Sequence, residues 1–349
     1  MAVPLTLSQG RCAVWEEPLG PSGVRMRRRP VVDPPAGHVR VRLQAAALNH
    51  LDLWVASGTQ RVTPPRVIAA DGAGVVEASG SPEWAPGDQV VVYPVAACWR
   101  CAPCRRGEQA HCTEFAVLGE HADGTACERI QVQAHSLHRR PAGLSWAETA
   151  ALPLAYLTAW RMLVTRARLS AGETLLVIGG SGAVGTAAIL IGRYLGARVL
   201  TTSRSDAKAE QLRALGAEHV FSSASGFARS VLDVTDGAAA DVVLDHVGGA
   251  TFDEALRAAA IGGRIVTCGA TAGAAAQLNL PRVFVRHLTI LGSTTGHSAE
   301  FADLIKAAGN GLRPRVDKEF PLSEAPLALA HLEGSDRVGK VVLDCADEA

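Results

Sequence analysis

Residues 174–185 read TLLVIGGSGAVG, an apolar run of strand type that passes directly into glycines spaced G-x-G-x-x-G. A helix-type stretch, AVGTAAILIGRYLG, follows from residue 183, so strand, tight turn and helix occur in the order of a dinucleotide-binding βαβ unit. Glycine lets the backbone approach a pyrophosphate closely, and the unpaired N–H groups of a helix start face its negative charge. A glycine turn that serves only helix–strand packing is the alternative. We predict a nucleotide-binding loop made of Gly180, Ser181, Gly182, Ala183, Val184 and Gly185.

Around this loop, apolar strands alternate with Ala- and Leu-rich helical stretches from about residue 143 to residue 293. Strands are expected at 174–178, 198–202, 219–221, 241–245, 264–268 and 287–291. Helices are expected at 146–163 before them and near 185–195, 206–215, 225–233 and 251–260 between them. The alternation predicts an α/β domain with a doubly wound parallel sheet of the Rossmann type.

The end of the second predicted strand, TTSRS at 201–205, bears on the choice of cofactor. NAD-specific domains place an acidic side chain there, on the ribose hydroxyls. This chain instead offers Ser203 as a hydrogen-bond donor and Arg204 as a cation for a 2′-phosphate, with Lys208 one helical turn further on. We predict NADPH; an exposed arginine on a solvated turn is the alternative.

The first 142 residues carry short β-type runs, separated by proline and glycine, at 38–48, 71–80, 87–97 and 128–137. They predict an irregular, mostly antiparallel β domain. After a helix expected at 300–308, β-type segments return and end in GKVVLDC at 339–345. The predicted organisation is a first domain, a Rossmann domain and a return segment that completes the first domain, over residues 1–142, 143–293 and 294–349.

Four of the eight cysteines lie in one short loop, namely Cys98, Cys101, Cys104 and Cys112. Four thiolates suit tetrahedral zinc in a structural site with no open coordination position. Arginines at 100, 105 and 106 offset the negative charge of such a site. An iron–sulfur cluster or a redox dithiol is the alternative. The pattern predicts one zinc ion that folds the loop and takes no part in catalysis.

Net charge and hydropathy limit the kinds of partner. Lysine plus arginine and aspartate plus glutamate number 34 each, so the formal net charge is zero and no whole-molecule field favours nucleic acid or an acidic membrane surface. The pattern lacks a signal peptide and any uncharged run long enough to cross a bilayer. We expect a cytoplasmic protein that acts on a small molecule, without a nucleic-acid or membrane partner.

Taken together, these features resemble the medium-chain dehydrogenase/reductase superfamily over essentially the whole chain, with a GroES-like β domain ahead of the Rossmann domain. The local sequence motifs resemble those of the quinone-reductase and enoyl-reductase branches of that superfamily. The segments that carry the resemblance are NHLDLW (49–54), DGAGVV (71–76), ALP (151–153) with LTA (157–159), DHVGG (245–249), LGST (291–294) and GKVVL (339–343).

The chain departs from the zinc alcohol dehydrogenases of this superfamily at the catalytic metal. The resemblance places Asn49, Ala70 and Leu154 where those enzymes hold zinc with cysteine, histidine or acidic side chains. An amide oxygen is a weak zinc ligand, and alanine and leucine have no donor atom, so the resemblance implies that the catalytic zinc is absent. Without this Lewis acid, alcohol oxidation loses charge stabilisation, whereas hydride addition to a conjugated C=C bond remains accessible.

The same segments supply candidate catalytic residues, namely Asn49, His50, Asp52 and Tyr156, with Asp71 in place of the family's glutamate. A turn cap is the structural alternative for Asn49, and an arginine partner is the alternative for Asp52 and Asp71. His50 is equally consistent with an ordinary satisfied histidine. Some enoyl reductases of this superfamily use a tyrosine near the position of Trp54, whose indole is too weak an acid, so the proton donor is open.

The resemblance also implies further contacts with the cofactor. Thr158 would lie against the nicotinamide, and Lys340 would approach the cofactor from the returning tail. The rest of the groove would be lined by Val247, Gly248, Cys268, Gly269 and Ala270.

Three functions remain open from the sequence. The leading hypothesis is an NADPH-dependent reductase of quinones or α,β-unsaturated carbonyls, enoyl thioesters included. The second is an alcohol or polyol dehydrogenase whose zinc is held by His50, Asp52 and Asp71. The third is a nucleotide-binding protein without turnover, structural or RNA-binding, as some relatives of quinone reductases are. The strand RHLTILGS (286–293) is expected at a sheet edge, where an unpaired strand invites aggregation, so we expect a homodimer.

Overall fold

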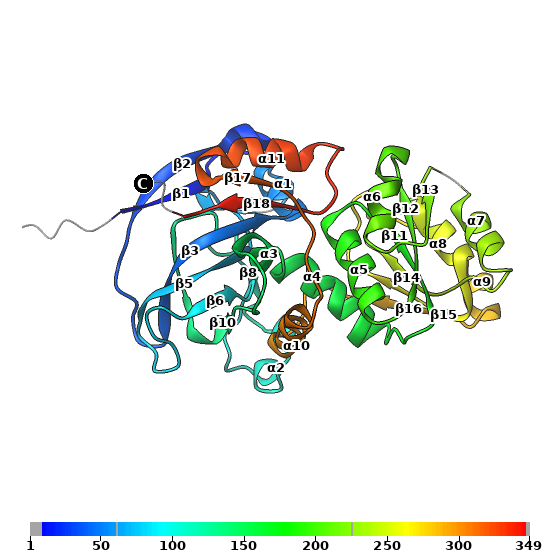
Figure 1. Cartoon of the computed structure of the whole chain (residues 1–349), viewed down its shortest axis with the longest axis horizontal. Helices are drawn as coiled ribbons and strands as arrows, with labels where there is room; N and C mark the ends of the chain where they lie inside the picture. Colours follow the sequence, from blue (N-terminus) through cyan, green and yellow to red (C-terminus); the bar gives the residue numbers. More distant parts are fainter. Residues whose placement is uncertain (1–8, 61, 225, 347–349) are drawn as a thin grey trace, which may run out of the picture. The chain divides into compact units, whose positions relative to one another are not determined.

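The computed structural model describes residues 9–60, 62–224 and 226–346 (Figure 1). The chain divides into two compact units. Unit 1 comprises Met1–Leu154, His297–Gly311 and Val316–Ala349, and unit 2 comprises Ala155–Gly296 and Leu312–Arg315. Residues 143–154, which we predicted to open the Rossmann domain, therefore belong to unit 1.

Unit 1 is built on a seven-stranded sheet that contains β3 (His38–Leu48) at its centre. Its strands follow the order β10-β6-β5-β3-β18-β17, and β9 also pairs with β3. The other strands are β5 (Asp71–Ser79), β6 (Gln89–Val92), β9 (Arg129–Gln133), β10 (Leu137–Arg139), β17 (Val316–Pro321) and β18 (Lys340–Asp344). The pairing of β17 with β18 is parallel, and the other pairings of this sheet are antiparallel. The return segment thus adds β18, which pairs with β3, and β17, which pairs with β18.

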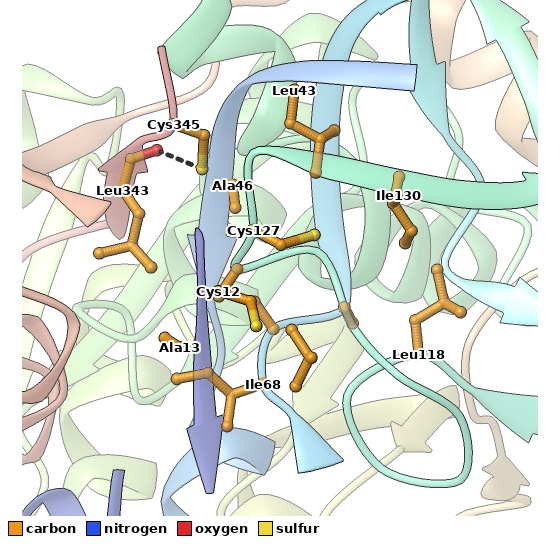
Figure 2. Close-up of a cluster of buried hydrophobic side chains, with 14 of the residues drawn as sticks. Cys12, Ala13, Leu43, Ala46, Ile68, Leu118, Cys127, Ile130, Leu343 and Cys345 are labelled. Atoms are coloured by element: carbon orange, nitrogen blue, oxygen red, sulfur yellow. Dashed lines mark hydrogen bonds between the residues drawn. The ribbon is translucent and has the colours of Figure 1, made fainter. Parts of the chain in front are cut away.

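The core of unit 1 follows from the side-chain alternation of β3. Val39, Val41 and Leu43 are buried while the residues between them are half-buried, which is the period of a strand with one apolar face. A smaller sheet contributes further buried side chains to the same core, part of which Figure 2 shows. This sheet has the order β2-β1-β4, with β1 (Gln9–Trp15), β2 (Val24–Pro30) and β4 (Arg66–Val67). A third, two-stranded sheet pairs β7 (Val95–Ala96) with β8 (Ala116–Val117).

Short helices connect these strands. They are η1 (Gly20–Gly23), α1 (His50–Ala56), α2 (Ala102–Arg105), η2 (Gln109–His111), η3 (Ala134–Ser136), α3 (Trp146–Ala150), α10 (Ser298–Gly309), η6 (Leu322–Glu324) and α11 (Ala325–Glu333). The sequence predicts α10 but neither α1 nor α11. Two turns of helix are too short to give a clear period of 3.6 residues.

Unit 2 contains a six-stranded parallel sheet in the order β13-β12-β11-β14-β15-β16. Its strands are β11 (Thr174–Ile178), β12 (Arg198–Ser203), β13 (His219–Ser222), β14 (Ala240–Asp245), β15 (Ala259–Thr267) and β16 (Thr289–Gly292). The helices that follow β11 in this unit are α5 (Ala183–Tyr194), η5 (Asp206–Lys208), α6 (Ala209–Ala214), α7 (Phe227–Val234), α8 (Thr251–Ala258) and α9 (Leu280–Val285). The strand order reverses between β11 and β14, so right-handed crossovers place α5 and α8 on opposite sides of the sheet (Figure 1). The predicted Rossmann fold is confirmed, and the reversal is the point where such sheets bind dinucleotides.

One predicted helix is broken. Proline has no N–H to donate inside a helix, and the expected helix 146–163 divides before Pro153 into α3 and α4 (Pro153–Trp160). A π-helix, η4 (Arg161–Arg166), continues α4. The boundary between the units falls within α4, between Leu154 and Ala155.

The longest helices, α5 and α10, have 12 residues each, whereas a bilayer core requires about 20. No helix within the described ranges can cross a membrane.

Candidate functional site

Three chain segments meet at one corner of the sheet in unit 1. The end of β3 pairs with the start of β5 on one side, with Ala47 opposite Asp71, and with the start of β18 on the other. Asn49 follows β3 directly, and Lys340 is the first residue of β18. The strand register therefore brings Asn49, Asp71 and Lys340 together, and we call this set of residues the lysine corner.

Lys340 is the cation of the lysine corner. Its Nζ donates to the carbonyl oxygen of Leu48 at 2.8 Å, to Oδ1 of Asn49 at 2.6 Å and to Oδ2 of Asp71 at 2.7 Å. The Nδ2 group of Asn49 donates to the same carboxylate oxygen at 2.9 Å. Lys340 and Asp71 are both 0% exposed. An ammonium has three hydrogens and each has an acceptor here, which is the condition under which a buried charge is tolerated.

Further hydrogen bonds tie neighbouring segments to the lysine corner. Oδ1 of Asp71 accepts from the N–H of Leu154 in α4 at 2.7 Å. The carboxyl group of Asp52 accepts from the N–H of Asn49 at 2.7 Å and from the N–H of Ala69 at 2.8 Å. Ala69 has a φ of 71°, a left-handed conformation that costs a residue with a side chain of order 1–3 kcal/mol. Asp52 therefore links α1 to a strained turn just before β5.

The carboxyl group of Asp52 titrates far from its ordinary range. Burial raises the pKa of Asp52 to about 6, although hydrogen bonds from the N–H groups of Asn49 and Ala69 and the charge of Lys340 act to lower it. Removal from water disfavours the anion more than these groups stabilise it. The protonation of Asp52 is thereby coupled to the backbone at Ala69.

Two of the four predicted catalytic residues belong to this hydrogen-bonded network. The side chains of Asn49 and Asp52 are buried, and the structure gives both of them partners inside unit 1. The structural alternative for Asp52 and Asp71 was an arginine partner. The cation that bonds to Asp71 is instead Lys340.

The other two predicted catalytic residues differ in exposure. Tyr156, in unit 2, is 0% exposed, and its hydroxyl oxygen accepts from the N–H of Arg315 at 2.7 Å. Burial raises the pKa of Tyr156, and the catalytic role of this residue stays a prediction. His50 begins α1, and its ring lies edge-on to Trp54 with 4.9 Å between the centroids. His50 is thus the one member of the four with an exposed side chain.

In unit 2 the glycine loop joins β11 to α5. A Cβ on Gly180 would lie 2.3 Å from Oγ1 of Thr201, and a Cβ on Gly185 would lie 2.1 Å from the carbonyl oxygen of residue 179, so both positions require glycine. Gly182 is the N-cap of α5. A Cβ there would meet, as its nearest described neighbour, Cε1 of His246 at 3.5 Å. The loop therefore leaves room beside a helix start, where a phosphate can approach free N–H groups.

The motif DHVGG forms a turn against this loop. Nε2 of His246 lies 3.1 Å from the carbonyl oxygen of Gly179. Asp245 is 0% exposed and accepts from the N–H groups of Val247 at 2.8 Å and Gly248 at 3.0 Å. Gly248 has a φ of 66°, which favours glycine. Sequence reasoning quoted this motif but missed His246, because nothing in the pattern relates its imidazole to a loop 67 residues away.

The residues predicted to hold a 2′-phosphate differ in their availability. The hydroxyl group of Ser203 donates to the carbonyl oxygen of Ser205 at 2.9 Å and accepts from its N–H at 3.1 Å, so it serves a local turn rather than standing ready as a donor. Lys208 is 8% exposed. Arg204, between them, is exposed. Of the three predicted residues, Arg204 presents the accessible cation.

The remaining predicted cofactor residues occupy both units. Thr158 is 8% exposed on α4, and burial raises the pKa of Cys268 to about 12. A Cβ on Gly269 would lie 3.0 Å from the carbonyl oxygen of His246, so the 268–270 segment passes beside the DHVGG turn. Lys340, which the resemblance places near the cofactor, has its ammonium buried in the lysine corner with all three hydrogens bonded.

The four cysteines of the lobe converge as a metal site requires. Their sulfur atoms all lie within 4.8 Å of one another, and in the part of the chain that the structure describes this is the one such group of His, Cys, Asp or Glu side chains. Three sulfur–sulfur distances are 3.5, 3.9 and 4.0 Å, for Cys98–Cys112, Cys101–Cys112 and Cys98–Cys104. Zinc–sulfur bonds of about 2.3 Å in a tetrahedron place sulfurs about 3.8 Å apart. The lobe therefore fits a zinc ion held by Cys98, Cys101, Cys104 and Cys112.

Backbone and side-chain groups adjust the charge of the lobe. Three backbone N–H groups donate to its sulfur atoms at 3.3 Å. Two of the predicted compensating arginines are themselves paired with carboxylates, Arg100 with Glu114 at 2.8 Å and Arg106 with Glu108 at 2.7 Å. Part of the expected compensation is therefore taken up by these acidic side chains.

Two family models match the chain. One is described as the alcohol dehydrogenase GroES-like domain and matches residues 35–142. The other is described as the zinc-binding dehydrogenase and matches residues 183–310. Together they cover parts of both units.

Similar proteins include reductases and dehydrogenases. Acryloyl-coenzyme A reductase of Metallosphaera sedula is 32% identical over 316 residues, which are 89% of this chain and 93% of that protein. A mycocerosic acid synthase-like polyketide synthase of Mycolicibacterium smegmatis is 30% identical over 90% of this chain, which spans 14% of that protein's length. The crystal structure of an NAD-dependent alcohol dehydrogenase has a TM-score of 0.91 at 39% identity and covers 96% of this chain and 99% of its own.

Proposed function

This chain belongs to the medium-chain dehydrogenase/reductase superfamily of zinc-type alcohol dehydrogenase-like proteins, and we propose that within it the protein is an NADPH-dependent reductase. The proposed substrate is a quinone or an α,β-unsaturated carbonyl compound, enoyl thioesters included. The proposed reaction delivers hydride without a catalytic zinc. The relative named acryloyl-coenzyme A reductase supports the enoyl thioester as the first substrate to test.

The lysine corner is the observation on which this proposal rests. A catalytic zinc at the segments that the resemblance assigns to it would need ligand atoms from Asn49, Ala70 and Leu154. The amide oxygen of Asn49 accepts from the Lys340 ammonium at 2.6 Å, and the other two side chains have no donor atom. A second cation next to a buried ammonium is strongly repelled. This donor set does not fit zinc, which supports chemistry without that metal.

Reduction of a conjugated C=C bond needs three things that a chain of this kind can provide. NADPH, when bound, supplies hydride for the carbon β to the carbonyl group. The protein must hold the carbonyl oxygen with hydrogen-bond donors and deliver a proton to the α carbon. Among the four predicted catalytic residues, His50 combines a titratable group with an exposed side chain, and it is the proposed candidate for proton transfer.

The choice of NADPH is supported by Arg204, and it has a direct test. The Arg204→Glu variant should raise the Kd for NADPH about 10- to 100-fold, because a charge-assisted hydrogen bond to the 2′-phosphate is replaced by repulsion. The Kd for NADH should change little. Arg229→Glu, which alters another exposed arginine of unit 2, is the matched control and should leave both values unchanged. Equal weakening of both cofactors, or tighter binding of NADH by the parent protein, would contradict the proposal.

Metal content and turnover test the function itself. Elemental mass spectrometry of the purified protein should find one zinc ion per chain. The protein should also oxidise NADPH with acryloyl- or crotonyl-coenzyme A, or with a quinone, as the substrate. Primary alcohols should support no reduction of NADP⁺. A second zinc ion together with alcohol turnover would favour the other candidate.

That other candidate is an alcohol or polyol dehydrogenase, and the 39% identical dehydrogenase structure favours it. It would need zinc ligands from His50, Asp52 and Asp71. Asp52 and Asp71 are buried, and each of their carboxyl groups already accepts at least two hydrogen bonds. A nucleotide-binding protein without turnover, structural or RNA-binding, is the candidate of another class, and NADPH consumption with any of these substrates would eliminate it.

We also propose that the protein forms a homodimer through unit 2. Strand β16 lies at an edge of the described sheet. Several exposed apolar side chains accompany it, namely Ile261, Leu280, Phe284, Val285 and Ile290. An unpaired edge beside such a patch is protected when the same strand of a second copy pairs with it.

A further inference from the structure

Three cysteines outside the zinc lobe gather in the core of unit 1 (Figure 2). Cys12, Cys127 and Cys345 are 2%, 6% and 1% exposed, and all three are free thiols. None of them takes part in the lysine corner. Their distribution along the chain gives no hint of this proximity, because β1, the turn before β9 and the end of β18 bring them together.

Cys12 and Cys127 face each other across an antiparallel bridge. The backbone hydrogen bonds on either side join Ala13 N–H to the oxygen of Ala126 at 2.8 Å and Glu128 N–H to the oxygen of Arg11 at 3.0 Å. The cysteines themselves therefore form a non-hydrogen-bonded pair, whose Cα atoms lie about 4.5 Å apart and whose side chains share one face. Disulfides need Cα atoms about 4.4–6.8 Å apart, so this backbone can accept one without moving.

The reduced thiols are held only by weak hydrogen bonds. Sγ of Cys12 lies 3.6 Å from the oxygen of Arg27, and Sγ of Cys127 lies 3.2 Å from the oxygen of Arg129 and 3.7 Å from that of Gly124. Each bond is released by rotation about the Cα–Cβ bond of one cysteine. Side-chain rotation is fast and costs little compared with a backbone change.

A partly open cavity of about 410 Å³ gives access to the pair. Cys12 and Cys127 both line it, and Cys345 does not. Arg29 also lines the cavity, where it pairs with Asp123 at 2.5 Å. The volume exceeds that of a small peroxide many times, since one water occupies about 30 Å³.

The two thiols differ in how readily they ionise. Burial raises the pKa of Cys12, and the guanidinium of Arg29 acts to lower it. Burial raises the pKa of Cys127 well above its ordinary value, and the neighbouring Cys345 and Cys12 raise it further. The thiolate is the form that attacks an oxidant, and because the charge of Arg29 favours it at Cys12, we assign the first attack to Cys12.

We propose that Cys12 and Cys127 form a disulfide site that takes hydroperoxides as its oxidant. The Cys12 thiolate attacks a peroxide oxygen, so that an S–O bond forms, the O–O bond breaks, and the leaving oxygen takes a proton. The Cys127 thiol then attacks the sulfenic sulfur, so that the S–S bond forms as the S–O bond breaks, and water leaves. Two thiols and one hydroperoxide give one disulfide, one alcohol and one water.

The bond would close a covalent loop from residue 12 to residue 127. That loop contains the zinc lobe, Asn49 and Asp71. A long closed loop lowers the entropy of the unfolded chain, so the oxidised protein should be the more stable form. The midpoint of thermal unfolding should rise by about 5 °C or more and return to its starting value with a reducing agent.

The test treats the zinc-loaded full chain with tert-butyl hydroperoxide, alkylates the remaining thiols after denaturation, and maps linked peptides by mass spectrometry. The expected product joins the Cys12 and Cys127 peptides while zinc stays bound. Cys345→Ala is the matched control, and it should keep both the link and the reversible thermal shift. Cys12→Ala and Cys127→Ala should lose both.

Several results would overturn the proposal. A link between Cys127 and Cys345 would assign the site to the wrong pair. Oxidation of Cys12 to the sulfinic acid with Cys127 still alkylated would show that the two sulfurs do not meet. Recovery of both thiols intact after treatment would show that the cavity does not admit the oxidant. Because the peptide map uses the parent protein, it decides the question even where a variant fails to fold.

Discussion

Lys340 sets the energetics of the site at the scale of single residues. A lysine with 0% exposure is rare, because taking an ammonium out of water costs several kcal/mol. Three acceptors offset that cost, and each belongs to β3 or β5 or to the residue that follows β3. The loss of one charged partner would leave the other buried without a counter-ion, whereas the loss of both would leave a neutral polar cluster.

The Lys340→Met variant should therefore lose about 3–5 kcal/mol in the free energy of unfolding, because Asp71 becomes a buried carboxylate without its cation. The double variant Asp71→Asn/Lys340→Met should recover a large part of that loss. Urea denaturation at neutral pH measures both values. A single variant within 1 kcal/mol of the parent would contradict the proposed importance of the ammonium.

Asp52 should make stability depend on pH. With a folded-state pKa of about 6 against about 3.9 in the unfolded chain, the folded protein retains a proton between pH 4 and 6 that the unfolded chain has lost. The resulting stabilisation is fully present below pH 4 and disappears as the pH rises through 6, by up to about 3 kcal/mol. The difference in free energy of unfolding between the parent and Asp52→Asn should fall over that window. A difference that stays constant with pH would refute the assignment.

Some of these residues could be predicted from the sequence because their signal is local. The glycine spacing at 180–185 and the cysteine spacing at 98–112 each lie within a few turns of chain, and both occupy the expected geometry. The bond between Lys340 and Asn49 joins residues 291 apart, and only the pairing of β3 with β18 creates it. The cofactor contact predicted for Lys340 came from the family resemblance, which gives no information on this pairing.

At the scale of elements, the cysteine lobe is a segment whose order should depend on a bound metal ion. Its two helices, α2 and η2, have four and three residues, too few to be stable alone. The sulfur ligands and their backbone donors supply the missing cohesion. The lobe is therefore the part of unit 1 most sensitive to chelation.

Cys104→Ser should reduce the zinc content from one ion per chain to almost none, because a structural site needs all four ligands. Trypsin should then cut faster after Arg100, Arg105 or Arg106, while NADPH binding by unit 2 stays within about twofold. Cys268→Ser, which lies outside the lobe, should keep its zinc. Unchanged zinc content in Cys104→Ser would mean that other groups bind the metal.

The elements themselves were predictable where they are long or strongly alternating. All six strands of unit 2 and the strand β3 lie where the sequence placed them, within a few residues. The prediction of one helix over 146–163 was wrong at Pro153. The apolar pattern continues across this residue, but proline has no N–H to donate to a helical hydrogen bond. The helices α1 and α11 were not predicted because each is shorter than three turns.

At the scale of the whole molecule, unit 2 is inserted within unit 1. The chain leaves unit 1 after Leu154, returns at His297 and contributes Leu312–Arg315 to unit 2 before β17. Two features of the sequence indicated this arrangement. Short β-type runs give way to alternating strands and helices at about residue 143, and β-type segments return after about residue 294. The boundary at Leu154 could not be read, because the apolar helical pattern runs through it. The proposed homodimer is tested at this scale.

Phe284→Glu combined with Ile290→Lys should convert the protein from a dimer to a monomer, because two charges replace apolar side chains at the exposed edge. Light scattering coupled to gel filtration should then report 36.4 kDa instead of twice that mass. Leu327→Glu changes an equally exposed leucine of unit 1 and should remain dimeric. A parent protein that already elutes as a monomer would dismiss the proposed interface.

The separation of Lys340 from Asn49 also governs events on the ribosome. Asn49 and Asp71 are synthesised long before the strand that carries their cation, and unit 2 is translated in between. At about 5–20 residues per second, the 291 residues that separate Lys340 from Asn49 correspond to roughly 15–60 s of translation. During that interval the Asp71 carboxylate must stay hydrated, so the edge of β3 that later receives β18 cannot close until Lys340 has been synthesised.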